Sequence, residues 1–578
     1  MTRNLLRLGL AAALAGGSTV TLVQTLPQDA PDETRAYVPV TDARLREPHP
    51  EDWLMYRRTY DGWGYSPLDQ ITARNVADLA PAWIFRTGVR DGALQAAPIV
   101  NGNTMFVTTA AQVIALEADS GALLWRYERE LPSDLKRPHP TNRGVALYGD
   151  KVYVGTLDAH VVALRATSGA VVWERAVEDY RLSYYVTMAP LVVKGKVMVG
   201  TSGGEHGIRG SITALDAETG DEVWKRHTIP APGEPGSGTW HGDAWRTGGG
   251  SVWLTGNYDP ALDLTYWGVG NGGPWTGDAR PGDNLYTNST IALDADSGEL
   301  RGHFQYHGNG SWDWDEASPP LLLTVDRGGG TTRALVHAGR NGYLWRLERT
   351  AAGMRFLDAR PFVHQNVFVG LDPLTGRPTY DAARVPGIGK RAVFCPSTGG
   401  ARNWPPEAFS PRTRLLYISA HNNRCGVMEG RAVEYRPGHP FVGADDKWFR
   451  REGTDHLDEL QAWNVDTGRR IWIREFPFDE QVGIEPLGAT LATAGDLVFL
   501  GGTNFRAFDA LSGTPRWRIR PIHHRATGTP TSYAVGGVQY VAVPFQGRRA
   551  EENGQNPPAA GDDLRDDIIV AFALDCQC

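Results

Sequence analysis

Four short segments carry polar residues that strand packing does not call for. Glu205 lies in a glycine-rich run, where a backbone without side chains lets a flat ligand or a metal come close. Asn271 is flanked by glycines and offers an amide oxygen suited to a hard cation. Asp313 and Asp315 alternate with tryptophans, so on an extended chain both carboxylates share one face and can ligate one ion. Arg340 stands beside an Asn-Gly turn, where it can bind a carboxylate or polarise a carbonyl oxygen.

Each of these residues also has a plainer interpretation. Glu205 can be an exposed loop glutamate, Asn271 a turn residue in the left-handed conformation, and Arg340 a solvated arginine. The two aspartates can instead perturb each other's pKa. The segments therefore point to a site only when they are taken together with the elements that position them.

A short pattern recurs along the chain: alanine, an apolar or aromatic residue, a polar turn ending in Ser/Thr-Gly, then three residues and tryptophan. Clear copies span 115–125, 163–173, 214–224, 462–472 and 507–517, and weaker ones begin at 292 and 370. Each copy predicts a strand, a tight turn whose glycine takes a positive φ, and a second strand. The tryptophan at a fixed offset can dock on the neighbouring repeat.

The early copies recur about every 50 residues, which is the signature of a propeller blade. Residues 45–578 leave room for about eight blades with long insertions, and the stretch between 292 and 462 must hold degenerate blades or excursions. No linker divides the repeats, and radial repeats share one closure. We therefore predict an all-β fold, a single eight-bladed β-propeller domain with tryptophan-docking repeats.

Composition agrees with this architecture and excludes other classes. Hydrophobic residues make up 41% and charged residues 21% of the 578, which is ordinary for a globular protein. The 68 glycines and 38 prolines favour many short strands over long helices. A net charge of −8 without a long Lys/Arg run makes nucleic acid or an anionic membrane a poor partner.

The N-terminal segment has the pattern of a secretory signal. Arg3 and Arg7 precede a short apolar stretch followed by small residues. We expect residues 1–25 to be a signal peptide and the mature chain to be periplasmic, with no stable membrane insertion. The alternative is an uncleaved anchoring helix, although the stretch is shorter than the roughly 20 residues that a span needs.

The sequence has four cysteines. In an exported chain Cys395 and Cys425 can form a disulfide, and the alternative is two unpaired buried thiols. Cys576 and Cys578 cannot be assigned a role. No Cys-x-x-Cys-His occurs, so covalent c-type haem is not expected on this sequence.

Together, the four polar segments and the repeat resemble the pyrroloquinoline quinone (PQQ) dependent alcohol dehydrogenases, quinoproteins with an eight-bladed propeller. The resemblance begins at residues 52–71, covers nearly everything after the N-terminal segment, and keeps the motifs in the family's order. It implies that Glu205, Asn271 and Asp313 surround a metal that sits on the quinone. It further implies that Asp313 is the catalytic base and that Arg340 hydrogen-bonds the reactive quinone oxygen.

The same resemblance implies the rest of the cofactor site. Trp253 matches the indole floor on which the quinone stacks. Further cofactor contacts implied in this way are Gln95, Asn142, Arg143, Thr156, Ser202, Gly203, Gly204, Asn403 and Trp404. Cys395 and Cys425 match a disulfide of the family.

The implied reaction is the oxidation of an alcohol. The metal acts as a Lewis acid on the quinone carbonyl, Asp313 removes the hydroxyl proton, hydride passes to the quinone, and Arg340 stabilises the developing oxyanion. Without a haem motif, the electrons are expected to pass to a separate acceptor such as a soluble cytochrome c. The expected substrate is a small alcohol or a polyol.

Three departures from the family pattern bear on the substrate and the metal. Residues 136–144 lack the adjacent cysteines that many members carry, so His139 or Pro138 is expected to cap the quinone. Leu487 stands near the place of a common tryptophan, which predicts a wider pocket. Asp315 resembles an extra ligand of the lanthanide-dependent branch, and Gly204 leaves room for a larger coordination sphere, but members with the same Asp-x-Asp use divalent ions. The metal is therefore expected to be Ca²⁺ or a lanthanide.

Three rival functions stay open at the level of sequence. One is a sugar or polyol dehydrogenase with the same cofactor. Another is a non-enzymatic propeller of the outer-membrane assembly scaffold type, which would have no use for Glu205, Asn271, Asp313 and Arg340 at once. The last is a quinoprotein fold that has lost its cofactor, against which the metal ligands argue.

Overall fold

The computed structural model describes residues 37–89, 94–136, 139–477, 487–521, 523–547 and 566–574. The predicted signal peptide and Cys576 and Cys578 lie outside these ranges. None of the helices within them has the length and apolar character needed to cross a bilayer.

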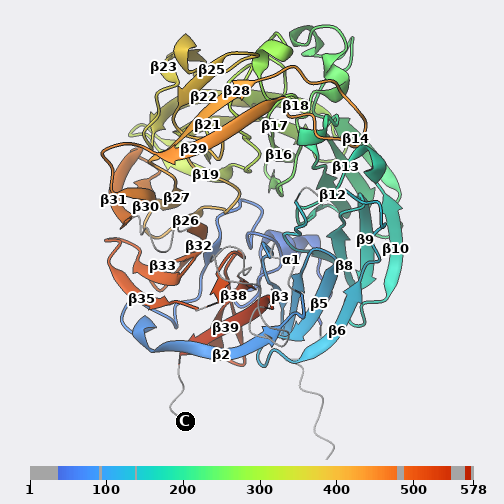
Figure 1. Cartoon of the computed structure of the whole chain (residues 1–578). Helices are drawn as coiled ribbons and strands as arrows, with labels where there is room; N and C mark the ends of the chain where they lie inside the picture. The colour runs from blue at the N-terminus through green and yellow to red at the C-terminus, as the bar shows by residue number, and fades with distance from the viewer. Residues whose placement is uncertain are drawn as a thin grey trace, which may run out of the picture.

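In the described part of the chain, eight antiparallel sheets follow one another around a ring (Figure 1). The first four are β3 (Ile99–Asn101), β4 (Thr104–Thr108), β5 (Gln112–Glu117) and β6 (Leu123–Glu128); β7 (Ala146–Tyr148), β8 (Lys151–Gly155), β9 (His160–Arg165) and β10 (Val171–Ala176); β11 (Leu191–Val193), β12 (Lys196–Gly200), β13 (Ser211–Asp216) and β14 (Glu222–His227); and β15 (Asn257–Asp259), β16 (Leu264–Val269), β17 (Ser289–Asp294) and β18 (Leu300–Gln305).

The remaining blades hold both later segments and two N-terminal strands. The fifth and sixth are β19 (Leu321–Asp326), β20 (Thr331–Ala338), β21 (Tyr343–Thr350) and β22 (Gly353–Pro361), then β26 (Ala408–Ser410), β27 (Leu415–Ala420), β30 (His456–Asn464) and β31 (Arg469–Pro477). The seventh is β32 (Leu487–Thr493), β33 (Leu497–Gly502), β34 (Phe505–Asp509) and β35 (Pro515–Ile519), extended by β1 (Tyr65–Ser66). The eighth is β37 (Thr531–Val535), β38 (Val538–Gly547), β39 (Ile568–Leu574) and β2 (Leu79–Arg86), and β36 (His524–Arg525) also pairs with β38.

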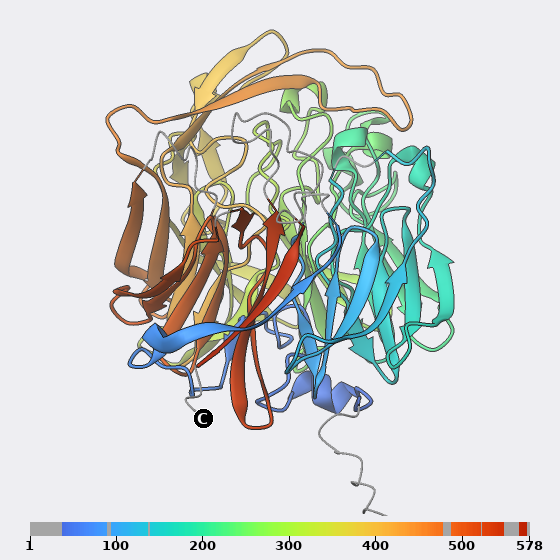
Figure 2. The ribbon, with the colours of Figure 1, turned by 60° about the horizontal axis from the view of Figure 1, so that its bottom comes forward.

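The ring closes between segments far apart in the sequence. β2 pairs antiparallel with β39, with Leu79 opposite Leu574, so an early strand completes the last blade (Figures 1 and 2). Helical elements in the described ranges are short: α1 (Asp42–Arg46) and the 3₁₀ turns η2 (Val76–Asp78), η3 (Tyr180–Leu182), η4 (Gly204–His206), η5 (Ser237–Thr239), η6 (Ala244–Thr247), η7 (Gly277–Ala279) and η8 (Ala382–Arg384). The predicted all-β propeller is confirmed.

The tryptophan repeat works as predicted between most blades. Trp125 on β6 donates its indole N–H to the carbonyl of Ala166 in the next blade, 2.8 Å away, and its ring lies where a Cβ on Gly169 would be. Gly169 has a φ of 71°, so the turn both needs a positive φ and leaves space for the ring. The same indole-to-carbonyl bond is made by Trp83, Trp173, Trp224, Trp472 and Trp517.

At two further contacts, other side chains take the place of the tryptophan. Phe356 packs its ring on Gly376, the glycine of the copy that begins at 370. Between the fifth and sixth blades, Arg346 donates to the carbonyl of Val465, 2.8 Å away, at the position that an indole N–H takes elsewhere. The fifth blade is thus the degenerate blade expected in this stretch.

The predicted excursion is a small sheet that leaves the ring. It contains β25 (Arg391–Phe394), β28 (Arg424–Gly430) and β29 (Ala444–Arg450), and a hairpin of β23 (Phe368–Leu371) and β24 (Pro378–Tyr380) lies before it in the chain. We call β25, β28 and β29 the excursion sheet. It lies over one end of the ring (Figures 1 and 2).

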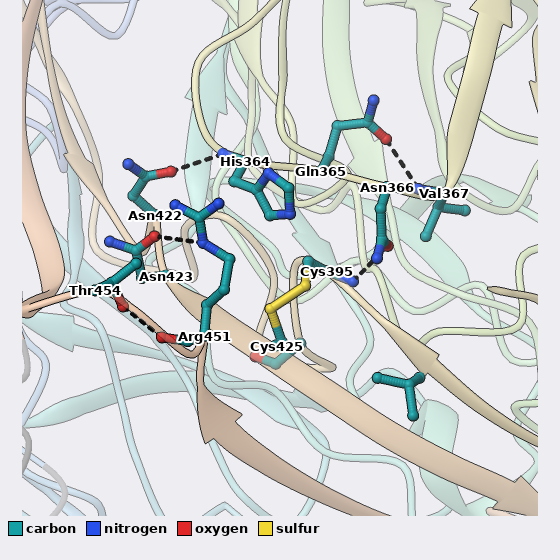
Figure 3. Close-up of a disulfide and its surroundings, with 12 residues drawn as sticks. His364, Gln365, Asn366, Val367, Cys395, Asn422, Asn423, Cys425, Arg451 and Thr454 are labelled. Atoms are coloured by element: carbon teal, nitrogen blue, oxygen red, sulfur yellow. Dashed lines mark hydrogen bonds between the residues drawn. A yellow bond between two sulfur atoms is a disulfide. The ribbon is translucent and has the colours of Figure 1, made fainter.

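A disulfide between Cys395 and Cys425 holds the excursion sheet together, as predicted (Figure 3). Cys395 directly follows β25, and Cys425 lies on β28. Both cysteines are buried, and the backbone N–H of Cys395 donates to Asn366 at 2.8 Å. The bond closes a loop with a sequence separation of 30.

Candidate active site

A cavity of about 630 Å³ lies where one end of the blades meets the excursion sheet. Most of its lining comes from segments that precede the first strand of a blade or follow the second. These two strands are antiparallel, so both kinds of segment lie at the same end of the ring. The predicted site residues that line the cavity are Gln95, Arg143, Ser202, Gly203, Glu205, Trp253, Asp313, Asp315, Arg340, Asn403 and Trp404.

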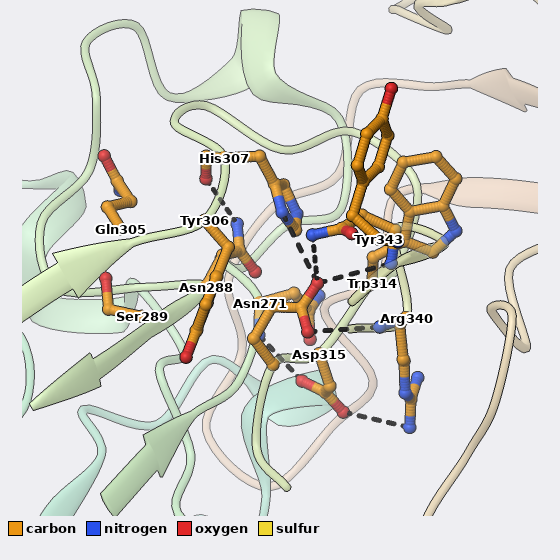
Figure 4. A network of polar contacts seen from close by, with 12 residues as sticks. Asn271, Asn288, Ser289, Gln305, Tyr306, His307, Trp314, Asp315, Arg340 and Tyr343 are labelled. Carbon is orange, nitrogen blue, oxygen red and sulfur yellow. Dashed lines mark hydrogen bonds and ion pairs between the residues drawn. The ribbon is translucent and has the colours of Figure 1, made fainter. Parts of the chain in front are cut away.

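Two further predicted residues lie directly behind this lining. The backbone N–H of Asn271 donates to Asp315 at 2.7 Å, and Asn271 is buried (Figure 4). Gly204 lies in η4 between Gly203 and Glu205, and a Cβ there would lie 3.1 Å from the Ser251 hydroxyl. The structure thus brings the predicted metal ligands together from three consecutive blades.

Asp315 and two arginines fix the indole of Trp253. The indole N–H donates to Asp315 Oδ2 at 3.0 Å, and Arg340 Nη2 lies 3.5 Å from the same oxygen. The guanidinium carbons of Arg143 and Arg340 lie 4.9 Å and 5.6 Å from the indole centroid, within cation–π range. The ring is therefore a flat wall with positive charge held over it.

Arg340 is aimed by its other hydrogen bonds. Its Nη1 donates to the backbone carbonyl of Asp313 at 3.0 Å, and its Nη2 donates to Asn403 Oδ1 at 3.0 Å. Asp313 has a φ of 59°, a left-handed conformation that costs free energy in a residue other than glycine. The hydrogen bond from Arg340 to that carbonyl therefore holds the strained turn and the arginine in fixed positions relative to each other.

Acidic residues of the cavity raise the pKa values of their acidic neighbours. Burial, reinforced by the charge of Asp315, raises the pKa of the Asp313 carboxyl well above its usual range, although Arg340 lowers it. Burial and the charge of Asp315 likewise raise the pKa of Glu205 to about 6. Several carboxylates that line one cavity favour a bound cation, and carboxylate and amide oxygens are the ligands of hard cations.

The cavity also holds polar atoms that no described protein group satisfies. Asp313 Oδ1, Arg143 Nε and Gln95 Oε1 are buried without a hydrogen-bond partner in the described part of the chain. Such atoms are costly unless a ligand or water bonds them. A flat indole, arginines and unpaired donors and acceptors fit a planar, multiply charged quinone such as PQQ.

The comparisons with known proteins identify the family of the chain. Residues 53–354 and 443–541 match the family described as "PQQ: Glucose/ethanol/alcohol dehydrogenase, beta-propeller domain". The chain belongs to the PQQ-dependent alcohol dehydrogenase family. It is therefore an oxidoreductase, and the predicted family is confirmed.

Named relatives of this PQQ-dependent alcohol dehydrogenase span most of its length. It is 35% identical over 514 residues to the quinoprotein alcohol dehydrogenase PedH of Pseudomonas putida, covering 83% of this chain and 84% of that one. It is 34% identical over 565 residues to the quinohemoprotein alcohol dehydrogenase of Comamonas testosteroni, covering 92% and 78%. A europium-containing methanol dehydrogenase superposes with a TM-score of 0.84 at 30% identity, covering 92% and 99%.

Two predicted cofactor contacts lie elsewhere. Thr156 donates its hydroxyl to Asp158 at 2.6 Å and lines a separate small cavity together with Asn142. The Asn142 amide donates to the carbonyl of Gly155 at 2.7 Å. The Thr156 side chain is therefore turned toward a neighbouring aspartate and lines the small cavity, so its contact with the cofactor stays a prediction.

Thr187 lies in the main cavity instead. Its hydroxyl accepts from Arg143 Nη1 at 2.8 Å and lies 3.0 Å from the Ser202 hydroxyl. A signal for it exists in the sequence, because Gln95 and Thr187 each stand two residues before an Ala-Pro that leads into a first strand. The repeat thus places them at equivalent positions.

Sequence reasoning also missed Glu316, which is fully buried next to the site. Its carboxylate accepts hydrogen bonds from His337 Nε2 at 2.7 Å and from the backbone N–H of Arg340 at 3.1 Å. It also accepts from the backbone and side chain of Asn341. Glu316 therefore fixes the turn that carries Arg340.

Of the residues that depart from the family pattern at the quinone cap and at the pocket wall, the structure places His139. His139 lines the cavity, and burial lowers its pKa. Pro138 and the side chain of Leu487 lie outside the described residues.

Proposed function

We propose that this enzyme works in the periplasm, oxidises an alcohol to an aldehyde or ketone, and passes electrons to a separate acceptor such as a soluble cytochrome c. The observation that carries the site assignment is the convergence of Glu205, Asp313, Asp315 and Asn271 beside unpaired polar atoms of one cavity. The N-terminal signal pattern supports the location.

The residues that line the cavity have different roles in binding the cofactor. PQQ, when bound, supplies a quinone that accepts two electrons from the alcohol. Arg143, Gln95 and Ser202 offer polar groups to its border, and Trp253 offers the wall on which it stacks. The guanidinium of Arg340 lies where it can stabilise negative charge on a quinone oxygen.

Asp313 is the base in this proposal. Its Oδ1 is free of protein hydrogen bonds in the described part of the chain and is available to a substrate hydroxyl. A raised pKa makes a carboxylate a stronger base, and Arg340 and a bound cation keep it ionised at neutral pH. The proton of the substrate hydroxyl therefore passes to Asp313 Oδ1.

For the metal, we propose a lanthanide. Glu205, Asp313 and Asp315 together carry three negative charges, which match a trivalent ion, and a similar solved enzyme is described as europium-containing. Ca²⁺ is the second candidate. Both oxygens of Asp315 already accept hydrogen bonds, from Asn271 and Trp253, so Asp315 can serve the indole without joining a divalent ion.

The test is dye-linked alcohol oxidation by purified protein loaded with PQQ and either La³⁺ or Ca²⁺. We expect activity with La³⁺, and we expect Asp315→Ala to abolish most of it. Activity of this variant equal to wild type with La³⁺ would refute the ligand role of Asp315. Absence of activity in both samples, with no quinone absorbance retained after desalting, would refute the cofactor assignment.

A further inference from the structure

The excursion sheet gives the cavity a second polar wall. Asp446 and Trp448 on β29 both line the cavity, because residues two apart on a strand point to the same face. Gly426 lies opposite Trp448 on β28, and Arg424, on the same face, lines the cavity as well. Asp445, on the other face of β29, pairs with Arg431 instead.

Buried Asp458 holds two basic groups at this wall. His421 Nδ1 lies 2.7 Å from Asp458 Oδ1, and Arg424 Nη2 pairs with Asp458 Oδ2. Asp458 is only 2% exposed, so both partners are firmly positioned. Arg424 Nε is buried and has no hydrogen-bond partner among the described residues. Arg424 itself lines the cavity, so its guanidinium offers a donor to whatever occupies this part of it.

An acceptor lies on the same wall. Asp446 Oδ2 accepts from the Thr398 hydroxyl at 2.6 Å, and Thr398 also lines the cavity. Asp446 Oδ1 makes no hydrogen bond within the described ranges, and no basic side chain described here forms an ion pair with Asp446. The wall therefore offers the guanidinium of Arg424 as a donor and one carboxylate oxygen of Asp446 that has no partner among the described residues.

The chemistry of this wall discriminates among substrates. A hydroxyl group donates to Asp446 and accepts from Arg424, so it can satisfy either group. An alkyl chain would remove water from both groups without replacing their hydrogen bonds. A substrate carboxylate would be repelled by the unpaired charge of Asp446. Neither group has a role in the proposed oxidation itself.

We propose that Asp446 and Arg424 form a subsite for a second hydroxyl group of the substrate, so that the enzyme acts on diols or polyols in preference to simple alcohols. This inference rests on the proposed function, because it assigns the substrate class of the same cavity. The Trp448 indole, with Arg424 5.9 Å from its ring, closes the subsite on the solvent side.

The test compares kcat/KM for matched pairs, 1-butanol with 1,4-butanediol and 1-propanol with 1,2-propanediol, on the PQQ-loaded and metal-loaded enzyme. We expect wild type to prefer the diol of at least one pair by about tenfold or more. Asp446→Ala should lower that diol-to-alcohol ratio about tenfold, mainly through KM. Asp445→Ala, which removes a carboxylate from the outer face of the same strand, should leave the ratio unchanged.

Thermal denaturation of each variant checks its fold, and Asp446→Asn serves as a second variant if Asp446→Ala is unstable. Equal kcat/KM for diol and alcohol in wild type, or a ratio unmoved by both substitutions at Asp446, would overturn the subsite. Preference for 4-hydroxybutanoate over 1,4-butanediol would also overturn it. Failure of the proposed function looks different, because then no alcohol of either kind is oxidised.

Discussion

Glu316→Gln tests whether a buried carboxylate outside the cavity positions the arginine inside it. The two carboxylate oxygens accept four hydrogen bonds, all from the segment that carries Arg340. Glutamine has the same shape but turns one oxygen into an N–H₂ donor. The question is which of the four donors then loses its acceptor.

The local hydrogen bonds decide how the new amide is oriented. Asn341 cannot flip to accept from it, because Asn341 Oδ1 already accepts from the Tyr343 backbone N–H at 3.0 Å and the Trp345 indole at 3.2 Å. His337 can adapt, because its Nδ1 has no partner and can take the proton, leaving Nε2 as an acceptor. The amide N–H₂ therefore faces His337 and the backbone N–H of Arg340, and the latter is left unpaired.

An unpaired buried N–H costs about 1–3 kcal/mol, and the remaining bonds lose the assistance of the charge, so we expect a total loss of about 2–4 kcal/mol. Guanidinium unfolding measures this loss. Because Arg340 loses its backbone anchor, kcat should fall by at least about tenfold with KM little changed. Glu299→Gln, at an exposed ion pair with Arg301, is the matched control and should change neither quantity.

A fall in stability with unchanged kcat would refute the positioning role of Glu316, since the carboxylate would then support only the fold. Unchanged stability would refute the hydrogen-bond argument itself.

Two further predictions concern stability. Replacing both Cys395 and Cys425 by serine opens a loop with a sequence separation of 30, and chain entropy predicts that the free energy of unfolding falls by about 3.6 kcal/mol. Guanidinium unfolding under non-reducing conditions measures this fall, and a fall below about 1 kcal/mol would contradict the prediction. Burial raises the pKa of Asp61 from 3.8 to about 6, so the native state binds its proton more tightly than the unfolded state, and this contribution to stability is lost as pH rises from about 4 to about 6. Asp61→Asn keeps an acceptor for Thr59 and Trp63 but cannot titrate. The difference in the free energy of unfolding between pH 4.5 and pH 8 should therefore change by about 1–3 kcal/mol in this variant. An identical difference in both proteins would refute the assignment.

The sequence predicted the propeller because each strong repeat carries its own physical constraint. The turn glycine, which needs a positive φ, and the tryptophan at a fixed offset can both be recognised in a single copy of the repeat. Where Phe356 or Arg346 makes the contact, the pattern fades although the docking position is kept. The eighth blade could not be read locally, because Trp83 lies on a strand whose partner, β39, is at the other end of the chain.

The site was predictable where chemistry demands an unusual residue beside a strand. Glu205, Asp313 and Arg340 stand out for this reason, and all three line the cavity. Threonines carry no such mark, and the resemblance points to Thr156 although Thr187 is the threonine that lines the main cavity. Glu316 was missed because its work is to bind the backbone and side chains of the segment that carries Arg340, and hydrogen bonds of this kind leave no pattern in a sequence.

Because the strands of each blade are antiparallel, the residues that follow the second strand of every blade lie at the same end of the ring, where the cavity is. Arg340 follows the second strand of the fifth blade, Asn271 that of the fourth, and His421 that of the sixth, and Glu205 lies a few residues beyond the second strand of the third. One topological position thus supplies predicted metal ligands in two blades, a predicted quinone contact in the next, and, in the one after, the histidine that shares Asp458 with Arg424 of the proposed hydroxyl subsite. Thr156 follows the second strand of the second blade but turns to Asp158, so position brings a residue to the right end of the ring and its side-chain partners decide whether it faces the ligand.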